Sequence, residues 1–424
     1  MGDNKKDVVG QKSTHHTRCR VCGKSTLTPY LDLGDMPLAN NLPNTKEEAI
    51  NMDRFPLKVM FCENCCLSQL SEVVDPRLLF SNYFYRSSMS NTYVNHCAEM
   101  ARSFHKKYNL TPAVSFIIDI AGNDGTLLNE FKKELPGVRV LNIDPAKNIC
   151  AISRERGIPA IDEFLSINTA INVLVSHGKA DVITATNVFA HVNDVRDFIL
   201  SAKLLLHFNG VLVLEFPYLI DYIEGLEYNT TYHEHLSYMS ITPLDLLCKE
   251  TGMKIISVEK QNIHCGTVRV TIGHSYSGRD IENSVHEFLS MEDDMAFTEI
   301  DRYMEFDDAA CKNVGEICIL INDIRKDGKT IAAFAASAKG NTLLNLTGCT
   351  SEDIMYIVDD TPEKQFKFSP GTGIPILPVN ELQNNPPDYL LILAWNFEKE
   401  ILERVKDIYK GKFIIPVPVI KIID

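Results

Sequence analysis

The sequence predicts an α/β protein in which a central parallel sheet is flanked by two smaller units. Short apolar runs alternate with amphipathic stretches over residues 80–275, which favours parallel strands covered by helices on both faces. Paired cysteines mark residues 1–79, and a second, shorter alternation occupies residues 276–424. At roughly 100–200 residues per domain, a chain of 424 residues accommodates these three units.

The central unit contains several apolar runs of the length that buried strands have. The predicted strands are 114–119, 138–143, 180–185 and 210–216, and a helix is predicted over 127–135. The C-terminal unit begins with an acidic helical stretch whose apolar residues suit amphipathic helices. Its predicted elements are helices within 280–324 and over 342–346, and strands over 329–336, 354–358 and 389–394.

Composition is that of an ordinary globular protein, with 45% hydrophobic and 23% charged residues. The net charge of -14 argues against non-specific binding to nucleic acid or to anionic membranes. The sequence has no apolar run of the length of a transmembrane helix, and residues 1–16 are polar, unlike a secretory signal. We therefore expect a cytoplasmic protein, and the sequence leaves open whether it is a monomer or a dimer.

Two C-x-x-C pairs lie in the N-terminal unit. Cys19 and Cys22 form one pair, and Cys62 and Cys65 form the other. Each pair lets two thiolates reach one ion from a tight turn, and two pairs complete the tetrahedral shell that zinc prefers. Because four thiolates leave no coordination position open, we expect structural zinc. The alternative is unligated or redox-active thiols, and Cys66, His15 or His16 could compete as ligands.

A glycine-containing loop follows the first predicted strand of the central unit. The segment Asp119–Gly125 lies between that strand and a helix, where glycines permit a sharp turn and backbone N–H groups can bind a ligand. Asp144 ends the next strand, about 20 residues on, where an acid can accept hydrogen bonds from a ribose. Since the loop lacks the G-x-G-x-x-G pattern, an adenosine cofactor with an amino-acid tail is favoured. The candidate binding residues in the loop are Asp119, Gly122, Asn123, Asp124 and Gly125.

Titratable side chains gather at Tyr232–His235, shortly after a predicted strand. One imidazole there could take a proton from a carbon acid, and a neighbouring tyrosine or glutamate could orient it or stabilise an enolate. Metal binding and a plain surface loop are the alternatives. His191 also follows a strand, and there a structural histidine is the alternative to a functional one.

In the C-terminal unit, Lys339, Gly340 and Asn341 follow a predicted strand at a turn. The lysine charge and the backbone N–H groups of such a turn could bind a pyrophosphate. The alternative is an ordinary turn with a solvated lysine.

These motifs, in this order, resemble the sugar C-methyltransferases that act on nucleotide-linked 4-keto-deoxysugars, as in D-tetronitrose biosynthesis. The resemblance covers about residues 17–424. It is carried by the two cysteine pairs, Tyr85–Ser88, Asp119–Gly125, Asn187–His191, Tyr232–His235, Ala335–Thr342, Ser369–Thr372 and Ala394–Asn396.

The resemblance implies a zinc-binding N-terminal domain, a central Rossmann-like domain that binds S-adenosylmethionine (SAM), and a C-terminal domain that helps to hold a nucleotide sugar. It implies His235 as the catalytic base, with Tyr232 and Glu234 as partners. His191 and Tyr85 then lie on the substrate side, with Tyr83 as the alternative to Tyr85. Asn187 is expected among the cofactor-binding residues, and Lys339, Gly340 and Asn341 among the substrate-binding residues.

The resemblance therefore implies a SAM-dependent methyltransferase that methylates C3 of a 4-keto sugar through an enolate. Two other functions remain to be weighed. The same fold could methylate oxygen or nitrogen, or the chain could be a non-catalytic module that binds SAM or a nucleotide sugar.

Overall fold

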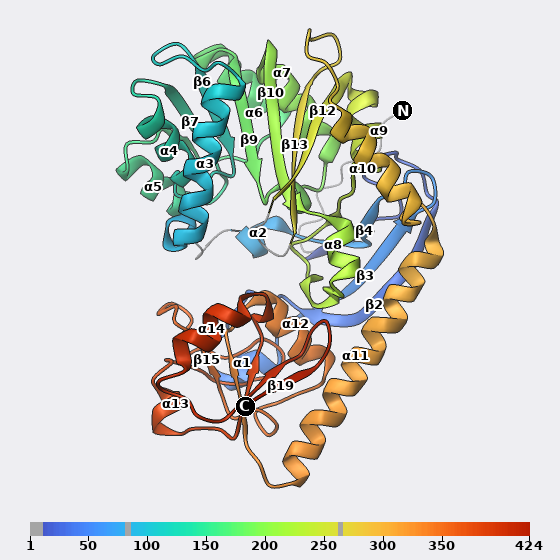
Figure 1. Ribbon diagram of the computed structural model, residues 1–424, viewed down its shortest axis with the longest axis vertical. Helices are drawn as coiled ribbons and strands as arrows, with labels where there is room; N and C mark the ends of the chain where they lie inside the picture. Colours follow the sequence, from blue (N-terminus) through green and yellow to red (C-terminus); the bar gives the residue numbers. More distant parts are fainter. Residues whose placement is uncertain (1–11, 81–85, 262–265) are drawn as a thin grey trace.

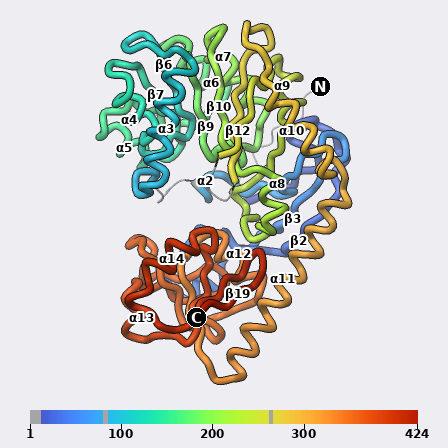
Figure 2. The backbone as a smooth tube through the Cα atoms, in the orientation of Figure 1, coloured from blue at the N-terminus to red at the C-terminus, as the bar shows by residue number. Residues whose placement is uncertain are grey.

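The computed structural model describes residues 12–80, 86–261 and 266–424. The central unit and the C-terminal unit lie at opposite ends of the long axis, and the N-terminal sheet lies beside them (Figure 1). The long helix α11 (Ile300–Lys326) runs along one side of the molecule, from the central unit to the far end of the C-terminal unit (Figure 2).

The central sheet has seven strands in the order β12-β13-β10-β9-β6-β7-β8. Every strand is parallel to its neighbours except β13, which is antiparallel to both β10 and β12. The strands are β6 (Phe116–Ile120), β7 (Arg139–Ile143), β8 (Ala160–Ile161), β9 (Ala180–Thr186), β10 (Leu206–Pro217), β12 (Met253–Gln261) and β13 (Thr267–His274).

Helices cover both faces of this sheet because alternate residues of its strands point to opposite sides. Ile117 packs with the apolar residues of α3 and α4. Phe116 and Ile118 instead belong to the core that includes α6 and α7. The helices of the central unit are α3 (Asn91–Lys107), α4 (Thr126–Glu134), α5 (Lys147–Glu155), α6 (Ile167–His177), α7 (Val195–Leu205), α8 (Leu219–Glu224) and α9 (Ile241–Thr251).

The N-terminal sheet includes a strand that comes from the central unit. Its order is β11-β4-β3-β2, and β11 (Ser237–Tyr238) pairs with β4 directly after the Tyr232–His235 segment. The sheet therefore fixes one end of that segment. The other elements are β1 (Ser13–His15), β2 (Leu27–Pro37), α1 (Lys46–Ile50), β3 (Arg54–Cys62), β4 (Ser68–Leu70), β5 (Glu72–Val74) and α2 (Pro76–Phe80).

The C-terminal unit is a second α/β layer structure, with the strand order β16-β15-β14-β17-β18-β19. Its strands are parallel except β19, which is antiparallel to β18. Together with the other two units, it confirms the predicted α/β class. Its elements are β14 (Ile331–Phe334), α12 (Ala338–Leu346), β15 (Ile357–Val358), β16 (Ile376–Leu377), α13 (Glu381–Asn384), β17 (Tyr389–Ile392), α14 (Glu398–Val405), β18 (Lys412–Ile415) and β19 (Lys421–Ile423). The helix α10 (Asn283–Asp294), which precedes them in the chain, packs against β12 and α9 of the central unit.

One helix begins earlier than predicted. The sequence suggested a turn over 339–341 and a helix from residue 342, whereas α12 begins at Ala338. Ser337 caps it, since its hydroxyl accepts a hydrogen bond from the Gly340 N–H at 3.2 Å. Lys339 therefore lies in the first turn of a helix.

Across the described ranges, none of the helices combines the length and the apolar character needed to span a bilayer.

Candidate active site and metal centre

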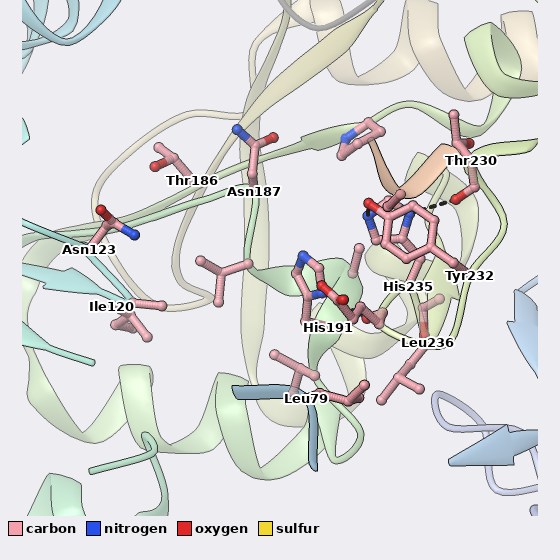
Figure 3. A pocket seen from close by; sticks show the side chains of 18 of the residues that line it. Leu79, Ile120, Asn123, Thr186, Asn187, His191, Thr230, Tyr232, His235 and Leu236 are labelled. Carbon is pink, nitrogen blue, oxygen red and sulfur yellow. Dashed lines mark hydrogen bonds between the residues drawn. The ribbon is translucent and has the colours of Figure 1, made fainter. Parts of the chain in front are cut away.

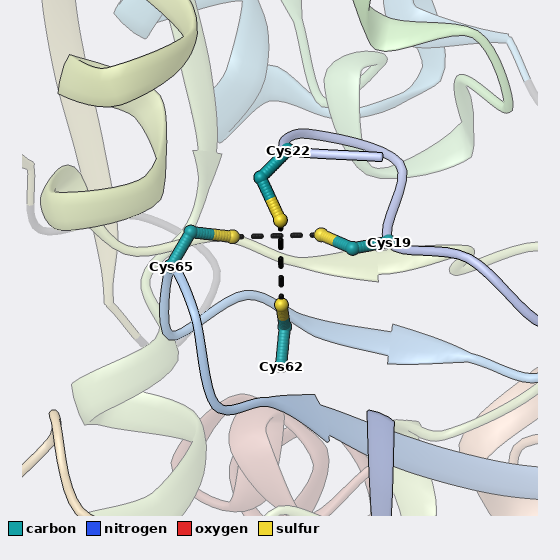
Figure 4. Close-up of side chains that lie close together, drawn as sticks. All are labelled: Cys19, Cys22, Cys62 and Cys65. Carbon is teal, nitrogen blue, oxygen red and sulfur yellow. Dashed lines mark hydrogen bonds between the residues drawn. The ribbon is translucent and has the colours of Figure 1, made fainter. Parts of the chain in front are cut away.

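The four predicted zinc ligands lie together in the N-terminal unit (Figure 4). The Sγ atoms of Cys19 and Cys65 are 3.4 Å apart, those of Cys22 and Cys62 are 3.6 Å apart, and all four lie within 4.8 Å of one another. Zinc–sulfur bonds of about 2.3 Å in a tetrahedron place sulfur atoms about 3.8 Å apart. The cluster therefore fits a zinc ion.

Backbone hydrogen bonds shape both cysteine turns. The Gly23 N–H donates to the Cys19 carbonyl at 3.0 Å, and the Cys65 N–H donates to the Cys62 carbonyl at 3.3 Å. Gly23 has φ 70°, which glycine adopts without steric cost. The neighbouring Cys66 is not in the cluster, and its Sγ instead lies 3.9 Å from the Thr298 carbonyl.

A cavity of about 870 Å³ lies where the three units meet. Figure 3 shows side chains that line it. The central unit contributes most of the lining. The N-terminal unit contributes residues that include Asn40 and Leu79, and the C-terminal unit contributes residues that include Lys339 and Asn396. The cavity has two polar regions. The first, the strand-end wall, comprises Asp119, Asn123, Asp144 and Asn187. The second, the imidazole wall, comprises His191, Tyr232, Glu234 and His235.

On the strand-end wall, Asp119 is the penultimate residue of β6 and is buried. Its Oδ1 accepts a hydrogen bond of 2.6 Å from the Thr184 hydroxyl, and burial raises the pKa of the carboxyl group to about 7. A Cβ atom at Gly122 would lie 2.5 Å from the Asp119 Oδ2, so only glycine fits this turn. The glycine thus lets the loop pass over a carboxyl group that faces the cavity.

Asp144 holds the same loop from the adjacent strand. Its two carboxylate oxygens accept hydrogen bonds from the N–H groups of Asn123, at 3.0 Å, and Ala146, at 2.8 Å. Each oxygen keeps a second lone pair that can accept from a ribose hydroxyl. Desolvation raises the pKa of Asp144.

Two loop residues predicted to bind the cofactor lie behind the cavity wall. Asp124 is fully buried. It accepts a hydrogen bond of 2.6 Å from the Thr126 hydroxyl and forms an ion pair with Arg156 at 3.1 Å. Gly125 precedes α4 with φ 76°. Neither residue lines the cavity, and both shape the loop from within.

Asn187 follows β9 and has φ 57°. Its N–H donates 2.8 Å to the Glu215 carbonyl, and its Oδ1 is buried without a hydrogen-bond partner among the described residues. An unpaired buried amide oxygen at a cavity wall suits a ligand that donates a hydrogen bond. Together with the carboxylates of the strand-end wall, it fits the adenosine and ammonium groups of SAM.

An ion network that the sequence did not predict lies behind Asn187. The buried Glu215 carboxylate bonds Arg269 at 2.6 Å and His96 at 2.8 Å, and these interactions lower its pKa despite burial. Glu215 stands in an apolar strand, which is an unusual place for a charge and was the available signal. His96 and Arg269 carry no local pattern that could have indicated them.

His235 lies on the imidazole wall with both ring nitrogens engaged (Figure 3). Its Nδ1 lies 2.9 Å from the Thr230 carbonyl, and its Nε2 lies 2.8 Å from the Tyr232 hydroxyl. A carbonyl only accepts, so Nδ1 carries the proton and Nε2 presents its lone pair. Burial, followed by His191 and Lys339, lowers the pKa of His235 to about 3, and the imidazole is therefore neutral at physiological pH.

His191 packs beside His235, with ring centroids 5.1 Å apart. Its Nδ1 donates a hydrogen bond of 2.7 Å to the Glu234 carbonyl, and burial lowers the pKa of His191. The Glu234 carboxyl group accepts a hydrogen bond of 2.7 Å from Asn40 Nδ2, and burial raises the pKa of Glu234 to about 7. The N-terminal unit thus holds a residue of the imidazole wall directly.

The two histidines of the Tyr232–His235 segment differ in position. His233 Nε2 lies 3.2 Å from the Phe55 carbonyl and 3.3 Å from the Pro56 carbonyl, which ties it to β3. Tyr83 and Tyr85, predicted on the substrate side, lie outside the described residues.

Of the three predicted substrate-binding residues in the C-terminal unit, Lys339 lines the cavity. Its Nζ donates 2.8 Å to Asn396 Oδ1 and lies 4.8 Å from the centre of the Trp395 ring. Gly340 packs so closely that an added Cβ would lie 2.6 Å from Leu393. Asn341 is buried and donates 2.8 Å to the Ala39 carbonyl, so it joins the C-terminal unit to the N-terminal one and does not line the cavity.

Comparisons with known families cover the three units separately. Residues 19–80 match the family described as "Putative zinc binding domain", residues 94–258 match "Methyltransferase domain", and residues 262–418 match "C-methyltransferase C-terminal domain". The chain is 30% identical to C-methyltransferase NovU of Streptomyces niveus over 408 residues, which is 96% of each chain.

Solved structures also resemble parts of the chain. The plantazolicin methyltransferase BpumL in complex with SAH is 15% identical with a TM-score of 0.33, covering 42% of this chain and 82% of its own. The magnesium protoporphyrin IX methyltransferase ChlM from Synechocystis PCC 6803 with bound SAH is 12% identical with a TM-score of 0.35, covering 47% of this chain and 92% of its own.

Proposed function

The chain belongs to the C-methyltransferase family and is a SAM-dependent methyltransferase with a structural zinc ion, and we propose that it methylates C3 of a nucleotide-linked 4-keto-deoxysugar. Family membership confirms the predicted enzyme class and both predicted cofactors. The sugar, its nucleotide and the catalytic roles below are the proposal.

The hydrogen bonding of His235 is the observation that carries the proposal. Because Thr230 holds the Nδ1 proton, Nε2 is the basic atom, and it lies on the cavity wall beside Tyr232. A carbon-bound hydrogen needs a positioned base before the carbon can accept a methyl group. Methylation of an amine needs little more than positioning, so this arrangement favours carbon as the acceptor.

The reaction follows from the acidity of the hydrogen on C3. A ketone at C4 acidifies that hydrogen, His235 Nε2 takes the proton, and the electrons of the C–H bond move to the ketone oxygen as an enolate. The Tyr232 hydroxyl, which donates to Nε2 in the structure, turns to the ketone oxygen and stabilises the developing negative charge, while His191 packs beside the base. SAM, when bound, supplies the methyl group that the enolate carbon receives as the carbon–sulfur bond breaks. The Asp119, Asp144 and Asn187 side chains hold and orient the cofactor.

The nucleotide arm of the substrate extends toward the C-terminal unit. Lys339 and Asn396 line that end of the cavity, and the lysine carries the positive charge that a pyrophosphate requires. Phosphate binding at Lys339 places the sugar between the two walls. The sugar ring can then meet His235 while its carbon faces the cofactor.

The test is His235→Asn. The assay measures methyl transfer from SAM to thymidine-diphosphate-linked 4-keto-6-deoxyglucose or to its 3-amino counterpart. We expect the rate to fall by roughly a hundredfold or more. SAM affinity, measured by calorimetry, should not change. His177→Asn, at the end of α6, is the matched control. Wild-type turnover in His235→Asn would remove this residue from the mechanism.

Exchange of the C3 hydrogen with solvent distinguishes methylation of carbon from methylation of oxygen or nitrogen. With SAM omitted, the wild-type enzyme in D₂O should exchange the C3 hydrogen of the bound keto sugar for deuterium, and His235→Asn should not. Mass spectrometry measures the exchange. Methyl transfer without exchange at C3 would argue for methylation at another position or on oxygen or nitrogen.

A further inference from the structure

The short helix η3 (Tyr228–Thr230) precedes the imidazole wall and determines how His235 is presented. The Thr230 carbonyl is the acceptor for the Nδ1 proton of His235. This bond fixes both the tautomer and the direction of the ring, since the other nitrogen must then face Tyr232. A shift of η3 would therefore move the lone pair of Nε2.

The C-terminal unit holds η3 by a buried hydrogen bond. The Tyr228 hydroxyl donates 2.7 Å to Asn313 Oδ1 on α11, and Asn313 Nδ2 donates 3.1 Å to the Pro416 carbonyl. Tyr228 is 0% exposed and Asn313 is 4% exposed. No solvent competes for these groups, so the bond is well suited to fix position.

Two longer contacts join the same segment to α12. Asn229 Nδ2 donates to the Lys339 carbonyl at 3.4 Å, and the Thr342 hydroxyl, which donates to the Ala338 carbonyl at 3.2 Å, also lies 3.4 Å from the Thr231 carbonyl. Lys339 therefore touches η3 through its backbone while its side chain lines the cavity. The unit that holds the nucleotide arm in the proposed function is the unit that holds η3.

We propose that Tyr228 and Asn313 are positioning residues for the methyl transfer, and that they act through the Thr230 carbonyl on His235. The C-terminal unit then has a second role besides substrate binding, because its contact with η3 sets the orientation of the His235 imidazole. This inference rests on the proposed role of His235.

Tyr228→Phe tests it by removing one hydroxyl. We expect kcat to fall roughly ten- to hundredfold, as misplacement of a catalytic group does, with little change in KM or in SAM affinity. The assay is methyl transfer to the same two thymidine-diphosphate-linked 4-keto sugars. Tyr409→Phe is the matched control, because its hydroxyl bonds the Asp388 and Lys412 carbonyls within the C-terminal unit, at 3.1 and 3.0 Å.

Asn313→Ala and the double variant add a coupling test. If the two residues act through their mutual bond, the double variant should lose no more kcat than the larger single loss. Multiplicative losses would mean that the residues act independently, and would overturn the proposed link.

The Nδ1 proton of His235 gives a readout that needs no substrate. In protein labelled with ¹⁵N-histidine, its resonance is the one that His235→Asn removes. Tyr228→Phe should shift or broaden it, whereas Tyr409→Phe should leave it in place. An unmoved resonance, or a kcat equal to that of Tyr409→Phe, would overturn the positioning role.

The failure of each proposal is distinguishable. Full activity in His235→Asn would remove the base itself, and with it the premise of the inference. An inactive His235→Asn together with a normal Tyr228→Phe would leave the base in place and remove only the positioning role.

Discussion

The strand-end wall and the imidazole wall face the same cavity but are held in different ways. Asp119 and Asp144 lie at or directly after the carboxyl ends of the neighbouring parallel strands β6 and β7, so the sheet itself brings them together. His235 lies in a segment without long elements, held by η3 on one side and by the pairing of β11 with β4 on the other. The first wall depends on one unit, and the second on contacts with all three.

Substitutions in different units should therefore separate cofactor binding from methyl transfer. A change within the central sheet should affect the cofactor first. A change in the N-terminal or C-terminal unit should affect the imidazole wall first, because Asn40 and Asn313 belong to those units.

Loss of zinc should produce the largest effect. Removal of the ion by a chelator, or Cys62→Ser, should disorder the N-terminal sheet, since a structural zinc contributes folding energy directly. Methyl transfer should then fall by about a hundredfold or more, while SAM affinity measured by calorimetry stays near the wild-type value. Cys311→Ser, at an exposed free cysteine, is the control. Equal loss of SAM binding would contradict the independence of the two walls.

Asp144→Ala should have the next largest effect, and this effect should be on the strand-end wall. The variant removes the acceptor for the Asn123 and Ala146 N–H groups and a candidate ribose ligand. We expect the Kd for SAM to rise roughly ten- to hundredfold, with kcat at saturating SAM little changed. Asp162→Ala, at an exposed aspartate paired with Arg154, should bind SAM normally.

Lys339→Ala should produce a smaller effect on the substrate alone. Loss of a charged hydrogen bond to phosphate should raise the KM for the nucleotide sugar about tenfold, and steady-state kinetics would measure this with kcat and SAM affinity unchanged. Lys339→Arg should recover part of the loss, and Lys326→Ala at the end of α11 serves as control. An unchanged KM would assign the lysine to the Trp395 contact alone.

The smallest expected effect concerns pH, because His235 should not titrate between pH 8 and pH 5. Because the pKa of His235 is lowered to about 3, its imidazole should stay unprotonated from pH 8 to pH 5 and gain a proton only as the pH falls through about 3. The ¹⁵N shifts of His235 should therefore remain constant over that range. A midpoint near pH 6.5 would show that the imidazole wall is open to water.

Local patterns predicted the elements of the central sheet because buried parallel strands produce continuous apolar runs. The predicted strand 180–185 corresponds to β9 (Ala180–Thr186), and the helix 127–135 corresponds to α4 (Thr126–Glu134). The start of α12 was missed because its cap is a single serine within a small-residue run, Ala335–Ala338. Asn40 could not be predicted at the cavity, since its contact with Glu234 spans 194 positions of the chain.

The zinc ligands and the glycine loop could be read from the sequence, because each depends on residues that are neighbours along the chain or along one sheet. Contacts between the units direct His235 Nε2 to the Tyr232 hydroxyl at the cavity wall and His233 to β3, and they place Lys339 at the cavity and Asn341 away from it. These side chains lie on short loops and helix turns whose direction is set by contacts with other units. Spacing along the chain carries no information about such contacts.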